Sequence, residues 1–292
     1  MSMKLCLITI SMLLTPLAAW AQQKPAPAYN SALCDGRLIA YGDWPKVQTP
    51  NFLLDISSSG GRLYYFGAEH SSDPANLQFS EIEKAWKSVK PTIAFYEGPN
   101  RPVASTAEET IRQAGESGFV RFLAARDNLR FISLEPPPEE EAAHIRKSYT
   151  AEQVMLFYVL RETARLRERR KLSEEELKKA VAQMLERASK MKGFEGTITN
   201  LSALDAAYRK YWSDPTEWWQ APQRWFDPGR TSAETGGKFT NEINRGSSQY
   251  RDLHMYRLLA KAVLEGNRVF AVVGRNHVPM QEQALRCALQ SR

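Results

Sequence analysis

Short apolar runs alternate with stretches of helical spacing along this sequence, and glycine, proline or a charged residue ends each run. The runs have the composition of buried strands. They cover residues 52–56, 63–66, 92–96, 129–134 and 269–273. Apolar residues at helical spacing mark helices at 77–89, 105–126, 247–265 and 279–290, and Gly115 and Gly118 are breaks in the second of them. Because strands that alternate with helices favour crossover connections, we expect an α/β fold with a mixed, largely parallel central sheet flanked by helices.

The middle of the chain follows a different pattern. Residues 139–192 contain two long helical patterns that join near Ser173, and Ser173 with Glu176 predicts a capping box for the second. We therefore expect a helical insertion at 139–213 on the sheet core. The charge-dense stretch 161–170 favours a solvated helix face over a binding patch.

A Trp-rich segment overlaps the end of the expected insertion. Residues 211–228 contain four of the seven tryptophans together with several prolines, and they show no helical period. Two interpretations stay open: the aromatic rings line a substrate cleft, or they fix the loop to the body of the protein.

The N-terminal residues predict export. Lys4 precedes an apolar run at 5–17, and small residues at Ala19 and Ala21 match a signal-peptidase site. The run is short for a membrane span, so we expect no span after cleavage and a periplasmic or secreted protein. The expected parts are a signal peptide at 1–21, a flexible leader at 22–31 and a single domain at 32–292.

The charge of the chain excludes one class of partner. The net charge is +6, from 39 basic against 33 acidic residues. These basic residues form no stripe with interleaved aromatics, so we expect no nucleic acid partner.

Two cysteines remain after the expected cleavage, and they lie near the two ends of the mature chain. Unpaired thiols often pair in an oxidising compartment, so Cys34 and Cys287 are predicted to form a disulfide. The alternative is two separate buried thiols.

Ionisable residues follow the four best strand-like runs. In chain order they are Glu69 with His70, Glu97, Glu135 and His277. Ligands of open α/β sheets bind at the carboxyl ends of the strands. We therefore expect these side chains to meet in one cleft.

Two of the four histidines share a local pattern, because Gly67 precedes His70 and Gly274 precedes His277 by three positions. Glycine lets the chain turn sharply off a strand and lets a ligand approach the backbone. Imidazole and carboxylate are ligands of Zn, Mn or Co, so His70, Glu97 and His277 predict a divalent metal site that activates water. Without a metal, a His–Glu pair would act as a general base on water. Both alternatives stay open.

Arg251 is expected near the start of the helix at 247–265. There its guanidinium would bind a substrate carboxylate or an oxyanion, or it would form a salt-bridged helix cap. His254 and His144 are expected outside the site, with His144 at the surface. The sequence contains no His-Glu-x-x-His, Gly-x-Ser-x-Gly or Walker motif, which argues against a zincin, a nucleophile-elbow hydrolase and a P-loop enzyme.

The order of these motifs resembles the TraB/Tiki/GumN family, part of a superfamily that also takes in ChaN-like and erythromycin esterase-like proteins. The similar segments are Gly67-Ala68-Glu69-His70, Glu97-Gly98-Pro99, Tyr250-Arg251-Asp252 and Gly274-Arg275-Asn276-His277. The resemblance implies a mixed sheet surrounded by helices, with a polar site at the strand ends. By this likeness, His70, Glu97 and His277 would be metal ligands or catalytic residues of a metal-dependent peptidase.

The expected function is hydrolysis of a peptide or small-molecule substrate. The expected catalytic residues are Glu69, His70, Glu97, Arg251 and His277. The resemblance also implies two alternatives: a metal-independent, esterase-like hydrolase that uses histidine as a base, and a haem- or metal-binding protein of the ChaN-like type. A scaffold whose strand-end residues are satisfied polar groups is the remaining possibility.

Overall fold

The last strand of the chain lies at the centre of the sheet. The computed structural model describes residues 29–43, 46–58 and 60–290. Its strands are β1 (Leu53–Ser57), β2 (Arg62–Ala68), β3 (Ile93–Tyr96), β4 (Arg130–Ser133) and β5 (Arg268–Gly274). They lie in the order β1-β2-β5-β3-β4, with β1 antiparallel to β2 and the other pairs parallel. The predicted α/β fold with a mixed, largely parallel sheet is confirmed.

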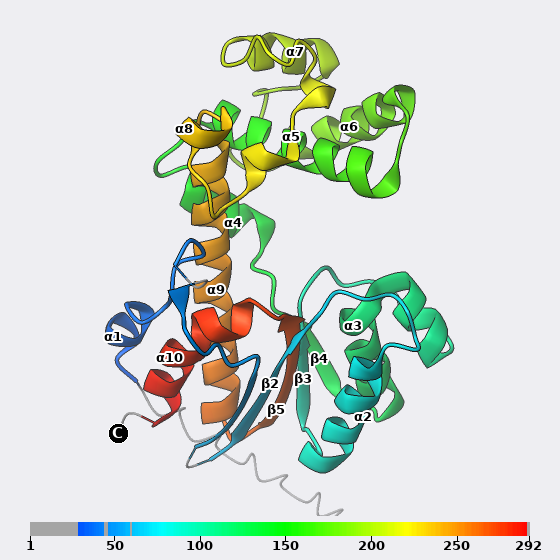
Figure 1. The fold of residues 1–292 in the computed structure, drawn as a ribbon, viewed down its shortest axis with the longest axis vertical. Helices are drawn as coiled ribbons and strands as arrows, with labels where there is room; N and C mark the ends of the chain where they lie inside the picture. The colour runs from blue at the N-terminus through cyan, green and yellow to red at the C-terminus, as the bar shows by residue number, and fades with distance from the viewer. Residues whose placement is uncertain (1–28, 44–45, 59, 291–292) are drawn as a thin grey trace, which may run out of the picture.

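Two helical layers cover the two faces of the sheet (Figure 1). Their helices are α1 (Ser31–Asp35), α2 (Leu77–Val89), α3 (Ala107–Arg126), α9 (Thr240–Leu264) and α10 (His277–Gln290). Strand side chains alternate between the layers, because successive residues of a strand point to opposite faces. In β5, Val269 and Ala271 pack in the cluster with α9 and α10, whereas Phe270 and Val272 pack with α2 and α3.

The helical part between β4 and β5 lies beyond the carboxyl ends of the parallel strands (Figure 1). Its elements are α4 (Pro138–Ile145), α5 (Ala151–Arg170), α6 (Glu174–Ala188), α7 (Leu201–Arg209), the 3-10 helices η2 (Trp218–Gln220) and η3 (Gln223–Phe226), and α8 (Ser232–Thr235). Apart from α8, these elements share a hydrophobic cluster of their own, to which Ile243 of α9 also belongs. We call this part the helical lobe.

The helical lobe contains three helices where the sequence predicted two over 139–192. Thr150 separates α4 from α5, because its hydroxyl accepts a hydrogen bond from the backbone of Gln153 in a capping box. That second capping box was overlooked at the sequence level. The predicted box of Ser173 and Glu176 is present at the start of α6.

The Trp-rich segment packs into the helical lobe. Trp212, Trp218 and Trp225 are buried in the same cluster as Phe157 of α5. The rings of Trp212 and Trp225 stack with their centroids 4.9 Å apart. Of the two open interpretations, fixing the loop to the body is therefore the one that these three tryptophans show.

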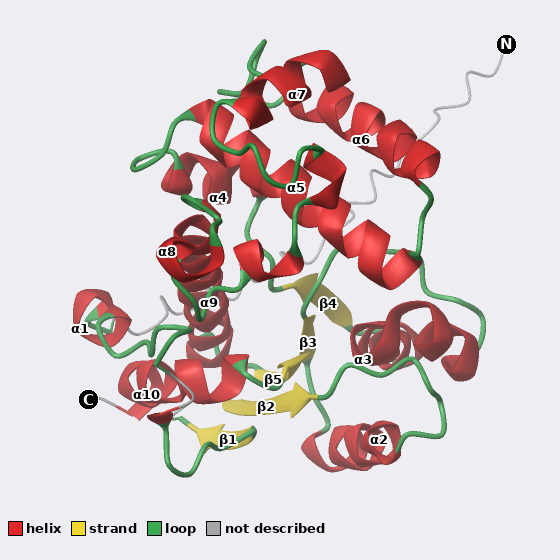
Figure 2. Cartoon of the chain, turned by 45° about the horizontal axis from the view of Figure 1, so that its top comes forward, coloured by secondary structure: helices red, strands yellow, loops and turns green. Residues whose placement is uncertain are grey.

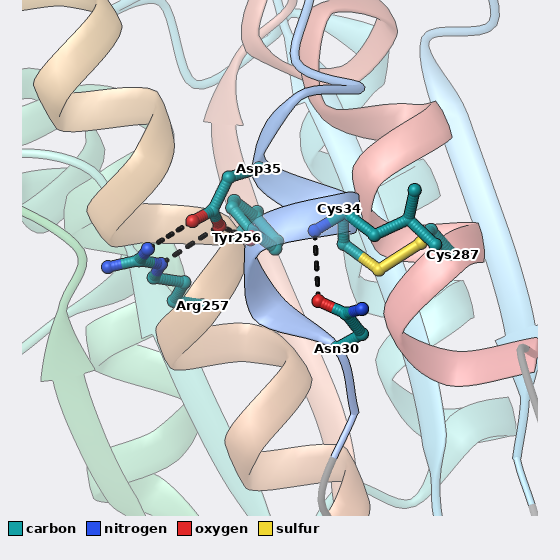
Figure 3. The surroundings of a disulfide bond; sticks show 7 residues. Asn30, Cys34, Asp35, Tyr256, Arg257 and Cys287 are labelled. Carbon is teal, nitrogen blue, oxygen red and sulfur yellow. Dashed lines mark hydrogen bonds and ion pairs between the residues drawn. A yellow bond between two sulfur atoms is a disulfide. The ribbon is translucent and has the colours of Figure 1, made fainter.

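The predicted disulfide joins α1 to α10. Cys34 and Cys287 are bonded, with their Cα atoms 5.5 Å apart and a sequence separation of 253 (Figure 3). Beside it, the carboxylate of Asp35 accepts hydrogen bonds from Tyr256 and Arg257 of α9. The short helix α1 is thus tied to both α9 and α10.

Two expectations about the N-terminal region concern residues that the structure leaves undescribed. The signal peptide at 1–21 and residues 22–28 of the leader lie outside the described residues. Within the described ranges, no helix combines the length and the apolar character that crossing a membrane needs.

Candidate functional site

The carboxyl ends of β2, β5, β3 and β4 lie along one edge of the sheet, on the side of the helical lobe (Figure 2). Glu97 directly follows β3, and its Oε2 accepts a hydrogen bond of 2.6 Å from the backbone N–H of Gly274, the last residue of β5. His70 and Glu135 follow β2 and β4 on either side. The fold therefore brings together strand-end residues that are far apart in sequence.

Glu97 is a largely buried carboxylate between two cationic side chains. Its Oε1 accepts a hydrogen bond of 2.9 Å from Nη2 of Arg251 and lies 3.4 Å from Nε2 of His277. Burial by itself raises the pKa of Glu97. The interactions with His277, Arg251 and the N–H of Gly274 outweigh this effect and hold the pKa well below its usual range. Glu97 therefore stays ionised.

His277 is the first residue of α10, and its ring lies between two carboxylates. Nδ1 lies 2.7 Å from Oδ1 of Asp252, and the same oxygen accepts a hydrogen bond of 2.6 Å from the amide of Gln281. The amide oxygen of Gln281 accepts in turn from the hydroxyl of Tyr65. Burial lowers the pKa of His277, but Asp252 and Glu97 together raise it to about 10. The ring therefore carries a positive charge at neutral pH.

Arg251 connects the ends of β3 and β4. Besides its bond to Glu97, it donates two hydrogen bonds to Glu135, from Nε at 2.8 Å and from Nη2 at 2.7 Å. Oε1 of Glu135 also accepts from the backbone N–H of Gly98. Burial lowers the pKa of Arg251, but the two carboxylates outweigh burial and raise it.

The position of Arg251 within its helix corrects the sequence prediction. The helix α9 begins at Thr240 rather than at 247, so Arg251 lies in its interior and is not a helix cap. Several buried positions in the first turns of α9 are occupied by polar residues. Asn241 and Asn244 donate hydrogen bonds to the backbone carbonyls of Arg224 and Phe226. Because these amides occupy buried positions, the hydrophobic period that would reveal the helix is missing.

His70 has one ring nitrogen held by a carboxylate. Its Nδ1 lies 2.6 Å from Oε1 of Glu116, whose side chain is 8% exposed, against 73% for His70. The hydrogen bond with Glu116 raises the pKa of His70. A β-carbon on Gly274 would lie 3.4 Å from Nε2 of His70 and 3.2 Å from Oε2 of Glu97. The space left by the missing side chain of Gly274 is therefore bordered by both groups.

Glu116 reaches His70 because α3 is kinked. Gly115 has φ of 56° inside the helix, a conformation that favours glycine. A β-carbon at this position would lie 2.8 Å from the backbone carbonyl oxygen of Ser71. The kink thus lets the segment after His70 run against α3 and meet the carboxylate that follows Gly115.

We expect Gly115→Ala to lower the free energy of unfolding by about 1–3 kcal/mol, because it adds backbone strain and a contact with Ser71. The change should also move Glu116 away from His70, so the pKa of His70, followed by NMR of its ring protons, should fall. Gly42→Ala is the matched control, since a β-carbon there meets nothing within 4 Å. Equal stability and equal His70 pKa in the two variants would contradict the importance of the kink.

Glu69 lies outside the cluster that its neighbours form. Its carboxylate pairs with Arg275 and is 70% exposed. Its backbone exchanges two hydrogen bonds with the side-chain amide of Gln78. The structure therefore brings His70, Glu97, Arg251 and His277 together, and it places Glu69 at the exposed rim.

Three cavities border this edge of the sheet. One of about 480 Å³ is lined by His70, Glu97 and several arginines. A second of about 360 Å³ is lined by His70, Glu97 and His277. The third, of about 710 Å³, is mostly apolar and lies between Glu135, the prolines at 136–138 and the helices α4 to α6. The strand-end residues are thus accessible to a small ligand.

The donor groups fit a divalent transition metal by their chemistry, provided that binding of the ion displaces the proton that His277 carries. His70 and His277 each have Nδ1 against a carboxylate, Glu116 and Asp252, which is the arrangement that orients metal-binding histidines. The space at Gly274 offers a place between His70 and Glu97. Within the described ranges, however, no three His, Cys, Asp or Glu side chains lie close enough together to coordinate one metal ion.

Two members of the cluster were not singled out at the sequence level. Glu116 follows Gly115, which the sequence marked only as a break in a helix. Asp252 follows Arg251 in the Tyr-Arg-Asp motif, and its role appears only when α9 packs against α10. Glu116 directly follows Gly115, and Asp252 directly follows Arg251. The ionisable residues next to these two positions were therefore the sequence signal that could have revealed the two partners.

The two remaining histidines lie outside the cluster. His144 was predicted to be a surface residue, but it is half-buried because its ring stacks on Tyr250 with the centroids 4.5 Å apart. His254 is also half-buried, and burial lowers the pKa of both rings.

Comparisons with known proteins find no relative: no family model matches the chain, and no curated protein or solved structure matches it either.

Proposed function

We propose that this chain is a periplasmic or secreted hydrolase that activates water at the carboxyl edge of its sheet. The observation that carries the proposal is the arrangement of two histidines, each with Nδ1 held by a buried carboxylate and each bordering Glu97. A histidine held in this way presents a defined Nε2 to a ligand. The disulfide between Cys34 and Cys287 supports an oxidising location.

In this proposal His70 is the general base, and the substrate is a peptide or a small molecule. A water molecule between His70 and Glu97 gives a proton to Nε2 of His70, while its oxygen bonds to the carbonyl carbon of the substrate. When the bond to the leaving group breaks, the proton passes from His70 to that group. Glu116 fixes the tautomer and orientation of His70, so it acts as a positioning residue.

The buried charges around Glu97 have a supporting role in the proposal. Arg251 and His277 keep Glu97 ionised and fixed at the wall of the cavity, where it orients the water. The positive charges of Arg251 and His277 also favour an oxyanion that forms nearby.

The metal-dependent form of the proposal uses the same residues. His70, Glu97 and His277 would hold a divalent ion such as Mn, Co or Zn. A bound ion of this kind supplies a water molecule with a lowered pKa. Glu116 and Asp252 would then orient the two histidines, as they do in the structure.

We expect His70→Ala to lower kcat/KM about 10²- to 10⁴-fold, because the general base is lost. Activity would be followed with p-nitrophenyl esters and peptide p-nitroanilides, with chelator and with added Mn²⁺, Co²⁺ or Zn²⁺, and bound metal would be measured in each preparation. His144→Ala is the matched control, since His144 stacks on Tyr250 outside the cluster. Full activity of His70→Ala would refute the assignment of the base.

The role of Glu116 has a readout of its own in the same assay. In the metal-free reaction the base must lose its proton, and Glu116 raises the pKa of His70 above the ordinary 6.5. The acidic limb of the pH–rate profile should therefore shift to lower pH in Glu116→Gln. A purely structural role of Glu116 would lower the rate at every pH and leave the limb in place.

The second candidate is a binding protein for haem or metal, and the apolar cavity of about 710 Å³, which shares Pro99 with the cavity beside His70, favours it. A Soret band on addition of haem that disappears in the double variant His70→Ala/His277→Ala would support this function. Turnover of any ester or anilide that depends on His70 would favour the hydrolase.

A further inference from the structure

Arginines from three separate segments line the cavity of about 480 Å³ beside His70. Arg101 comes from the loop after β3, Arg121 from α3, and Arg165 with Arg169 from α5. The two arginines of α5 belong to the charge-dense stretch that the sequence predicted to be a solvated helix face. They are exposed, but they face a cavity that they share with His70.

The acidic residues of this cavity already have hydrogen-bond partners. Glu116 is held by His70, and Glu97 is held by Arg251. Among the arginines, Arg165 forms a bidentate ion pair with Glu162, at 2.5 and 2.7 Å. Within the described ranges, no carboxylate lies within ion-pair distance of Arg101, Arg121 or Arg169. The cavity therefore has an excess of positive charge.

Arg121 is the least usual of these cations, because it is only 1% exposed. Its Nε donates to the backbone carbonyl of Ser117 at 3.2 Å, and Nη1 donates to the carbonyl of Arg101. Its guanidinium also lies 5.2 Å from the ring centroid of Tyr96. Carbonyl groups and an aromatic face stabilise the cation only in part, since a buried charge normally has an opposite charge beside it. An anion in the cavity would supply that charge.

We infer that the substrate carries an anionic oxygen group, a carboxylate or a phosphate, which the arginines of this cavity bind while the bond to be cleaved lies at His70. Planar guanidinium groups suit both anions, because two parallel N–H donors match two oxygens. The position of the cleaved bond rests on the proposed function. The anion site itself rests only on the arginines.

The test compares two esters with acyl chains of equal length. Mono-p-nitrophenyl succinate carries a free carboxylate, and p-nitrophenyl butyrate does not. We expect kcat/KM for the succinate ester to exceed that for the butyrate ester about 10- to 100-fold, as charge-assisted hydrogen bonds to one carboxylate allow. The double variant Arg165→Gln/Arg169→Gln should bring this ratio close to one.

The control variant removes the same net charge elsewhere on the helical lobe. Arg170→Gln/Lys192→Gln changes two exposed cations that do not line the cavity, so it should keep the preference for the succinate ester. An equal loss of preference in the two double variants would show a general effect of net charge and would overturn the inference.

A binding measurement separates this inference from the proposed function. Free succinate and inorganic phosphate are titrated by calorimetry, and we expect at least one of them to bind the parent and to lose affinity about tenfold in Arg165→Gln/Arg169→Gln. Such binding without hydrolysis of either ester supports the anion site and refutes the hydrolase. Hydrolysis of both esters at equal kcat/KM supports the hydrolase and overturns the anion site. If neither anion binds, the anion site is overturned as well.

Discussion

Replacing Glu97 by alanine is expected to lower the free energy of unfolding by about 3–5 kcal/mol, because the change leaves two buried cations without their shared carboxylate. The side chain of Glu97 is 18% exposed. It accepts hydrogen bonds from Arg251 and from the backbone N–H of Gly274, and it lies 3.4 Å from Nε2 of His277. Urea denaturation of the metal-free protein measures the effect. Glu97→Gln should fall between the parent and the alanine variant, since it keeps the shape of the side chain and loses the charge.

Glu69→Ala is the matched control for this measurement. Glu69 also follows a strand and pairs with an arginine, but its side chain is 70% exposed. We expect the loss of this surface pair to cost less than about 1 kcal/mol. If Glu97→Ala were as mild as Glu69→Ala, the charges at the strand ends would not be coupled as the distances indicate.

Removing the disulfide is expected to cost about 3–5 kcal/mol of stability. The bond between Cys34 and Cys287 closes a loop over 253 residues of sequence, and long loops gain most from a cross-link in the chain-entropy description. Both half-cystines are buried, so the variant Cys34→Ala/Cys287→Ala leaves small apolar side chains in place. Urea denaturation with and without reductant measures the effect.

The double variant supplies its own control for the reductant. Reduction should destabilise the parent to about the level of Cys34→Ala/Cys287→Ala and should leave the double variant unchanged. A parent whose denaturation midpoint does not respond to reductant would show that the bond contributes nothing to stability.

The framework of the site could be predicted from local patterns along the chain. Each strand-like run and the ionisable residue after it, such as Glu97 or His277, is visible in a short window of sequence. That these residues meet follows from a general rule, since the carboxyl ends of parallel strands lie on one edge of the sheet. The prediction therefore needed no knowledge of packing.

The partners of these residues depend on packing, and the sequence did not reveal them. Glu116 meets His70 only because Gly115 kinks α3 against the chain at Ser71. Asp252 meets His277 only because α9 lies against α10. Such contacts are set by how helices dock on the sheet, which a local period does not encode. The charged face of α5 is exposed, as predicted, but the cavity that Arg165 and Arg169 also line forms only in the folded protein.

The short helix α1 connects oxidative maturation to the geometry of the site. Arg251 and Asp252 come from α9, and His277 comes from α10. Through Asp35 and the bond from Cys34, α1 braces these two helices against each other (Figure 3). Forming one covalent bond near the ends of the chain therefore fixes the spacing of the two helices that present the buried charges. The geometry of the charged cluster therefore depends on this covalent link between α1 and α10 as well as on the sheet.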